Sequence, residues 1–282
     1  MGLKLRETNK FNYKGVRGIK QDMNLKVLYF SATGNTEVIC KEIAAGINKD
    51  YQIYDLTSKQ ARGKAYSFAE NDLLIVGVPV YSGRVPEFLE KALRKINGSS
   101  TPAVFVVTYG NREYDDALLE LKDIFEANGF KGIAGAAFIG EHSYGKEIAG
   151  ERPDSNDLKL AREFGIRIKE KLRGIKDLSG WPDLEVKGGY PLKERSKRFK
   201  DIRPETTEAC TECGICAENC PMEIISFENF RDIEPGKCIR CCSCIQKCPV
   251  DAKYFDDPGF NRIKKYLIKN FSDIRKDPEL FI

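Results

Sequence analysis

The sequence predicts an α/β protein whose main domain is a five-stranded parallel sheet with helices on both faces, followed by a small α+β domain. Two observations support this fold class. Residues 25–176 contain continuous runs of Val, Ile and Leu, typical of strands buried on both faces, and these runs alternate with stretches of helical periodicity. In residues 205–255, by contrast, cysteines recur at fixed spacing, which indicates a small domain organised around its thiols.

The strands of the main domain are predicted from their apolar runs. The first, LKVLYF at 25–30, precedes a turn-like segment and a helix in which Ile39, Ile43 and Ile47 recur every four residues. Further apolar runs predict strands at 51–55, 72–80, 103–108 and 133–139. The remaining helices are expected where apolar residues repeat on one helical face, at 86–96, 115–128 and 155–172.

Composition divides the chain into five segments. Residues 1–24 hold six Lys or Arg against two Asp or Glu, and this basic N-terminal extension therefore accounts for the formal net charge of +4. The rest of the chain is balanced in charge, which argues against a broad nucleic-acid-binding surface. The other segments are the main domain at 25–176, a linker rich in Gly, Pro and charge at 177–204, the cysteine-rich domain at 205–255 and a helical tail at 256–282.

The sequence also bears on where the protein works. No apolar run approaches the roughly 18 residues of a membrane span, and the N-terminus has no apolar signal core, so we expect a cytoplasmic protein without a membrane span. Its many thiols imply a reducing and oxygen-poor setting. Met23 directly precedes the first strand, so a second hypothesis is that translation starts there and that residues 1–22 are not part of the native protein.

The loop after the first strand has the composition of a phosphate-binding site. Its candidate residues are Ser31, Thr33, Gly34, Asn35 and Thr36. Glycine lets the backbone approach a ligand closely, the polar side chains supply donors, and the helix that follows offers unpaired N–H groups with a favourable dipole. The G-x-G-x-x-G of dinucleotide-binding folds and the lysine of a P-loop are both missing here. An ordinary helix cap is the alternative interpretation.

Two later loops, rich in aromatic residues and glycine, follow the third and fourth predicted strands. Since the carboxyl ends of neighbouring parallel strands lie at one edge of the sheet, these loops are expected beside the phosphate loop. Each tyrosine in them could instead be ordinary rim packing. The candidate binding residues are Pro79, Tyr81, Gly83, Thr108, Tyr109, Gly110, Asn111 and Tyr114.

The only histidine, His142, lies just past the fifth predicted strand, on the same side of the sheet as these loops. It is a candidate for proton relay or catalysis, with a structural role as the alternative. No other catalytic residue is predicted.

The cysteine-rich domain contains the pattern C-x2-C-x2-C-x3-C-P twice. Thiolates every third residue in a compact loop can face three corners of a cube, and the proline directs the chain away. Structural zinc, which takes tetrahedral sets of four, and a disulfide framework are the alternatives. Cys242, beside the second motif, is interpreted as a packed non-ligand, and Cys40 as a core residue. The motif cysteines are Cys210, Cys213, Cys216 and Cys220, followed by Cys238, Cys241, Cys244 and Cys248.

Both halves of the sequence resemble known families. The S-x-T-G-N-T loop directly after an apolar strand resembles the FMN phosphate loop of flavodoxins, which implies a flavodoxin-like fold with FMN outside the carboxyl ends of the strands. In that case Tyr114 or Tyr81 is expected to stack on the flavin ring. The repeated cysteine motif resembles bacterial two-cluster ferredoxins, which implies two 4Fe-4S clusters with interleaved ligands. One cluster would take Cys210, Cys213, Cys216 and Cys248, and the other Cys238, Cys241, Cys244 and Cys220.

The chain after residue 24 resembles flavodoxin-ferredoxin fusion proteins of anaerobic bacteria. The resemblance implies a protein that passes electrons between two 4Fe-4S clusters and FMN and exchanges them with protein redox partners. The alternative is an FMN-dependent reductase of a small acceptor such as a quinone or nitro compound, fed through its clusters. A redox sensor is a third, weaker interpretation. No nicotinamide-binding motif is recognisable, so direct oxidation of NAD(P)H is not expected.

Overall fold

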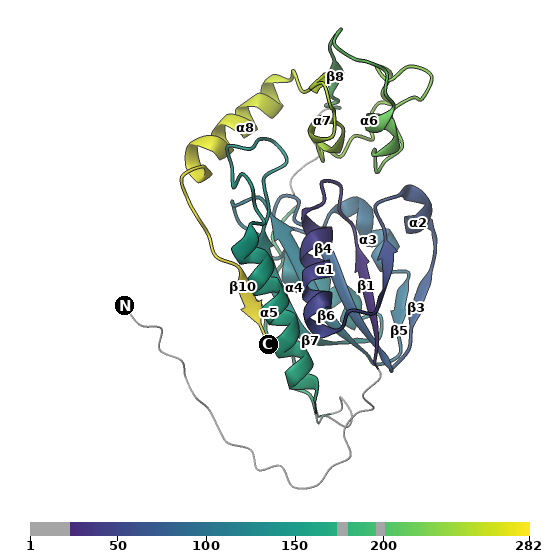
Figure 1. Cartoon of the computed structure of the whole chain (residues 1–282), viewed down its shortest axis with the longest axis vertical. Helices are drawn as coiled ribbons and strands as arrows, with labels where there is room; N and C mark the ends of the chain where they lie inside the picture. Colours follow the sequence, from purple (N-terminus) through teal and green to yellow (C-terminus); the bar gives the residue numbers. More distant parts are fainter. Residues whose placement is uncertain (1–22, 174–179, 196–200) are drawn as a thin grey trace.

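The computed structural model describes residues 23–173, 180–195 and 201–282 (Figure 1). The basic segment at 1–22 therefore lies outside the described residues. Within the described part, no helix is long and apolar enough to cross a membrane.

The main domain is built on one twisted sheet. Among the described residues the sheet has six strands in the order β10-β7-β6-β4-β1-β2. Five of them are parallel. Numbered by their place in the chain, they lie across the sheet in the order 2-1-3-4-5 of flavodoxin-like folds, which confirms the predicted fold class. The parallel strands are β1 (Asn24–Tyr29), β2 (Tyr51–Asp55), β4 (Asp72–Pro79), β6 (Thr101–Tyr109) and β7 (Phe130–Ile139).

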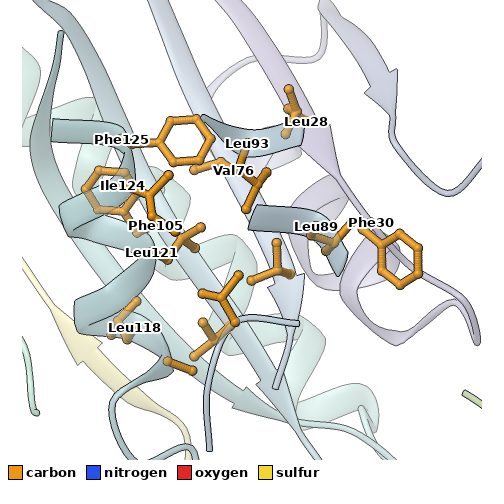
Figure 2. Close-up of a cluster of buried hydrophobic side chains, with 14 of the residues drawn as sticks. Leu28, Phe30, Val76, Leu89, Leu93, Phe105, Leu118, Leu121, Ile124 and Phe125 are labelled. Carbon is orange, nitrogen blue, oxygen red and sulfur yellow. The ribbon is translucent and has the colours of Figure 1, made fainter. Parts of the chain in front are cut away.

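Helices cover both faces of this sheet, and each face has its own apolar core. On one face α1 (Asn35–Ile47) and α5 (Ser155–Leu172) pack over β1, β4 and β6. Their backbones approach so closely that a Cβ at Gly46 or Gly165 would collide with a carbonyl of the facing helix. On the other face α3 (Glu87–Leu93) and α4 (Ala117–Glu126) cover the core drawn in Figure 2, where Phe105, Phe125 and their neighbours interlock.

A short helix and a two-stranded sheet of this domain were not predicted from the sequence. The helix α2 (Lys59–Gly63) leads to β3 (Tyr66–Phe68), which pairs in parallel with β5 (Ile96–Gly98). The helix predicted at 86–96 ends at Leu93, and Ile96, the last residue of the prediction, begins β5. These strands are only three residues long, too short for a recognisable alternation of apolar and polar side chains.

The cysteine-rich domain is small and contains little regular structure. It holds two four-residue helices, α6 (Ile215–Glu218) and α7 (Ser243–Gln246), and a short antiparallel pair, β8 (Glu205–Thr206) with β9 (Lys253–Tyr254). In Figure 1 it lies above the main sheet, at the end where α1 begins.

The C-terminal tail returns to the main domain. The predicted tail helix is present as α8 (Pro258–Phe271), started by the Asp257 side chain, which accepts a hydrogen bond from the Phe260 N–H at 2.8 Å. An extended segment follows and ends in β10 (Glu279–Phe281), which pairs antiparallel with residues 135–137 of β7. This edge strand was not predicted. The tail thus spans from the cysteine-rich domain to the far edge of the main sheet (Figure 1).

Candidate functional site

Four loops at the carboxyl ends of β1, β4, β6 and β7 converge on one cleft of about 380 Å³. This size falls in the range of ordinary ligand pockets, roughly 300–1,000 Å³. Ten of the thirteen predicted binding residues line it, from all the predicted loops. They are Ser31, Thr33, Asn35, Thr36, Pro79, Tyr81, Gly83, Thr108, Tyr109 and Gly110.

The phosphate loop is held in place by its own side chains. Gly34 has φ of +94°, a left-handed conformation that favours glycine, and directly precedes α1. The Ser31 hydroxyl accepts a hydrogen bond from the Glu37 N–H at 3.1 Å, and the Ser31 N–H donates to Thr57 Oγ1 at 3.0 Å. The loop and the first turn of α1 therefore have a fixed shape, as expected where backbone N–H groups receive an anion.

Two further residues tie this loop to its neighbours. The Asn35 amide donates to the Glu141 carbonyl at 3.1 Å, and the hydroxyls of Thr36 and Thr108 lie 2.5 Å apart. These contacts join the loops after β1, β6 and β7 into one rigid rim.

Three of the thirteen predicted residues do not line the cleft. Gly34 forms the turn beneath it. Asn111 is fully buried, and its amide donates to the carbonyls of Phe271 at 2.8 Å and Ile274 at 2.6 Å. Tyr114 is also fully buried, with its hydroxyl donating to Glu279 at 2.8 Å. Asn111 and Tyr114 thus anchor the C-terminal tail, and of the two tyrosines predicted to stack on a ligand, only Tyr81 reaches the cleft.

His142 lines the cleft and is held as a neutral base. Burial, with a smaller effect of Arg112, lowers its pKa to about 4. Its Nδ1 accepts a hydrogen bond from the Tyr144 N–H at 3.1 Å, and its ring packs edge-on against that tyrosine, 5.0 Å between centroids. The proton of the neutral ring therefore lies on Nε2. A neutral imidazole can donate from Nε2 into the cleft, but at neutral pH it carries no charge there.

Part of the cleft wall comes from outside the main domain. Ile263, Tyr266 and Leu267 of α8 form one side, and Ile239, Arg240 and Cys241 of the second cysteine motif form another. The sequence predicted a helical tail, but nothing in the sequence indicated which surface this helix covers. The wall is close to Tyr81, whose pKa is raised well above its usual range by burial and then by Cys241 and Cys242.

The eight motif cysteines surround two separate apolar cavities. Cys220, Cys238, Cys241 and Cys244 line one, here called the inner set, and Cys210, Cys213, Cys216 and Cys248 line the other, the outer set. Each set takes three cysteines from one motif and one from the other. Burial raises the pKa of Cys241 to about 12, so without a metal this thiol stays protonated. The four sulfur atoms around each cavity are the donor set of a metal cluster, and the residues therefore fit one in each cavity.

The comparisons with protein families agree with this geometry. A model described as a flavodoxin domain matches residues 26–131, and a model described as a 4Fe-4S dicluster domain matches residues 204–249. The chain is a flavodoxin domain followed by a 4Fe-4S dicluster ferredoxin domain. The predicted family resemblance is confirmed in both halves. The first domain implies a flavin, and the eight cysteines of the second suggest two 4Fe-4S clusters.

Several solved structures are similar to the flavodoxin domain. An archaeal flavodoxin is 18% identical, with a TM-score of 0.39, over 53% of this chain and 99% of its own. A flavodoxin from Streptococcus pneumoniae is 18% identical, with a TM-score of 0.37, over 52% of this chain and 98% of its own. Flavodoxin 2 from Bacillus cereus is 16% identical, with a TM-score of 0.37, over 52% of this chain and 99% of its own. A search of curated proteins found no match.

The two cysteines outside the motifs lie where the sequence predicted. Cys40 is fully buried in the core of the flavodoxin domain. Cys242 is also buried, in a small apolar cluster with Phe255 and Phe260 of the ferredoxin domain and tail. Its backbone has φ of +60°, unusual for a residue other than glycine.

The linker lies along α4 of the flavodoxin domain over its described part. The Tyr190 hydroxyl donates to Asp123 at 2.6 Å, and the Lys193 N–H donates to Asp116 at 2.6 Å. Arg195 pairs at 2.5 Å with Glu120, a buried carboxylate that also pairs with Arg84 at 2.8 Å. The charged run at 193–200 is thus partly engaged in ion pairs, and its residues 196–200 lie outside the described part.

The segment at 150–154 joins the cleft rim, α5 and the tail. Arg152 is buried, makes a two-pronged ion pair with buried Asp157, and donates to the Lys276 carbonyl at 3.0 Å. Asp154 caps α5 in a capping box with Asp157. Arg275 of the tail pairs with Asp154 at 2.7 Å. The segment therefore fixes the tail against the loop that carries His142.

Proposed function

We propose that this protein passes electrons between two 4Fe-4S clusters and FMN, and that it exchanges them with protein redox partners. The observation that carries the proposal is the shared wall of the flavin cleft. Cys241, a ligand of the inner set, lines the same cleft as the phosphate loop and Tyr81. A flavin in this cleft and a cluster in the inner cavity would be direct neighbours.

The cleft offers groups suited to each part of FMN. Thr33, Asn35 and the first N–H groups of α1 would hold the phosphate, since a helix N-terminus and hydroxyl or amide donors favour an anion. Tyr81 and the glycines after β4 and β6 would lie against the flat ring. When bound, FMN would supply a centre that accepts one or two electrons, whereas each cluster accepts one.

The ferredoxin domain supplies sulfur ligands and hydrogen bonds to them. The Ala252 N–H donates to Cys248 Sγ at 3.1 Å, and backbone N–H groups also act on Cys216, Cys238 and Cys241. Such hydrogen bonds stabilise negative charge on the sulfurs and help to set the potential of a cluster.

The two cysteine sets differ in exposure, which supports an order of electron transfer. The inner set is enclosed between the flavin cleft, α8 and the core of the ferredoxin domain. In the outer set, Cys213 is exposed, and the nearby Phe227 ring is 66% exposed. A partner protein can therefore approach the outer set, while the inner set lies between it and the flavin cleft.

An anaerobic redox titration of the reconstituted protein tests the proposal. Flavin absorbance and cluster EPR are followed together, after FMN, iron and sulfide have been counted. We expect one FMN, two clusters and a flavin that is reduced in separate one-electron steps. Absence of flavin or of one cluster would contradict the proposal, and a flavin reduced only in two-electron steps, with saturable turnover of a quinone or nitro compound, would favour the reductase instead.

A further inference from the structure

Arg62 of the flavodoxin domain lies against the ferredoxin domain, outside the cleft. It belongs to α2, and its Nη2 donates to the carbonyl of Pro221 and approaches Met222 Sδ at 3.9 Å. Pro221 directly follows Cys220, the ligand that the first motif contributes to the inner set. A side chain of one domain thus contacts the ligand segment of a cluster in the other.

The flavodoxin domain holds this guanidinium in one position. Its Nη1 donates to the carbonyls of Leu56 at 2.9 Å and Thr57 at 2.6 Å, directly after β2. The rings of Phe30 and Phe88 lie 5.7 and 5.5 Å from the guanidinium carbon, within cation–π distance. The charge is therefore fixed by contacts that do not depend on the ferredoxin domain.

The partial burial of Arg62 strengthens the interaction of its charge with nearby charges. The side chain is half-buried, and burial lowers its pKa, while Glu223 and Cys220 raise it. Arginine stays charged under all ordinary conditions. A fixed cation in a partly desolvated site interacts more strongly with a nearby charge than a cation in water does.

We propose that Arg62 raises the reduction potential of the inner cluster and thereby makes this potential depend on the flavodoxin domain. The inference rests on the proposed function, because it assumes a 4Fe-4S cluster in the inner set. When that cluster takes one electron from a reductant such as dithionite, its negative charge grows by one, and a nearby cation stabilises the reduced form. Two other cations near the cysteines, Lys253 and Arg240, belong to the ferredoxin domain itself: Lys253 acts on Cys216 and Cys244, and Arg240 acts on Cys238. Arg62 is therefore the contribution of the flavodoxin domain to the charge around the inner set.

The test compares wild type with Arg62→Gln in an EPR-monitored potentiometric titration. We expect the oxidised-to-reduced ratio of the inner cluster at a fixed potential to rise about tenfold, equivalent to about 59 mV for a one-electron couple. The outer cluster, identified by the signal that survives in Cys220→Ala, should keep its potential. Arg162→Gln is the matched control, since Arg162 pairs with Glu42 on an exposed face of the flavodoxin domain.

A second variant separates charge from hydrogen bonding. Arg62→Lys keeps the charge but loses the forked donor, so its inner cluster should retain most of the wild-type reduction potential. This variant also serves as the test if Arg62→Gln does not assemble its clusters. The inference is overturned if the reduction potential of the inner cluster shifts no more in Arg62→Gln than in Arg162→Gln. It is also overturned if Arg62→Lys lowers this potential by the full amount expected for loss of the charge. Since wild type is titrated alongside, missing cluster signals there would contradict the proposed function, and a missing shift would contradict only the role of Arg62.

Discussion

The two cysteine motifs have the same spacing and similar backbones, yet they lie in different surroundings. Each contains a four-residue helix that includes its third cysteine and ends before its fourth. Equivalent positions share the left-handed conformation, with φ of +55° and +54° at Glu212 and Arg240, and of +80° and +60° at Gly214 and Cys242. The repeat in the sequence is therefore a repeat in local structure.

The surroundings separate the two cysteine sets. The outer set lies at the surface, where Cys213 is exposed, whereas the inner set is covered by the flavodoxin domain and α8. Tyr144 of the flavodoxin domain packs on Phe260 of α8 with ring centroids 4.4 Å apart, next to Cys242. The comparison teaches that spacing sets the geometry of the ligands, while tertiary contacts set what each cluster can reach.

The largest expected effect comes from removing the cysteine that each motif contributes to the other motif's cluster. Cys220→Ala should abolish the inner cluster, although Cys220 belongs to the first motif, and Cys248→Ala should abolish the outer one. Iron counts should fall by about half in each variant, and the surviving EPR signals should differ.

Cys242→Ala is the control for these two variants, because Cys242 is outside the ligand pattern and should leave both clusters in place. Loss of both clusters from either ligand variant in correctly folded protein, or identical surviving signals, would contradict the interleaved assignment.

The next largest effect is expected from Phe260, which packs over the inner set. Phe260 is buried, and its ring stacks on Phe255 with centroids 4.2 Å apart. Phe260→Ala should cost about 3–5 kcal/mol of local packing, since it removes a buried aromatic ring. On exposure to air the inner cluster should then decay at least about tenfold faster, because local opening becomes more frequent.

Bleaching of the visible absorbance and the decay of each EPR signal measure this rate. The outer cluster should decay as in wild type, and an unchanged inner rate would show that Phe260 does not shield the inner set.

Local sequence patterns predicted most of the fold and of the site. The apolar runs gave all five parallel strands, and the apolar spacing gave the bounds of α5, whereas the tail predicted as helical at 256–282 is helical only in α8. The convergence of the loops after β1, β4 and β6 was also predictable, because the carboxyl ends of neighbouring parallel strands lie at one edge of the sheet. The grouping of the cysteines came instead from the resemblance to two-cluster ferredoxins, since each set takes one cysteine from the other motif.

Features that depend on distant parts of the chain were not predictable. Glu279 and Tyr114 are 165 positions apart, so neither the hydrogen bond between them nor the pairing of β10 with β7 leaves a local pattern. For the same reason Tyr114 resembles a ligand-stacking residue in sequence, although it anchors the tail. The contribution of Cys241 to the flavin cleft depends on how the two domains pack.

His142, in the loop after β7, should make the free energy of unfolding depend on pH. The pKa of His142 is about 4 in the folded protein and about 6.5 in an unfolded chain. Between these values the unfolded state binds a proton that the folded state does not, so stability falls as pH drops through this window. At about pH 5 the loss should be on the order of 2 kcal/mol relative to neutral pH.

Urea unfolding of anaerobic protein at both pH values measures this loss in wild type and in His142→Gln. The variant should lose less stability on acidification than wild type does. Equal losses in the two proteins would mean that His142 is not the group responsible.

The smallest expected effect addresses the backbone that the two motifs share. A Cβ at Gly214 would meet only ordinary contacts, the nearest at 3.8 Å, so Gly214→Ala adds left-handed strain without a collision. It should destabilise the ferredoxin domain by about 1 kcal/mol, the usual cost of a side chain in this conformation.

At Cys242 the strain is already present. Cys242→Gly should therefore be more stable than Cys242→Ala by a similar amount, since both variants remove the thiol and only the alanine keeps a Cβ. Comparing the urea midpoints of the three variants with wild type measures both effects. Cys242→Gly could instead be no more stable than Cys242→Ala while Gly214→Ala is destabilised. The two motifs would then be equivalent only in their cysteine spacing, because the surroundings of the second motif would set its backbone conformation as well as its exposure.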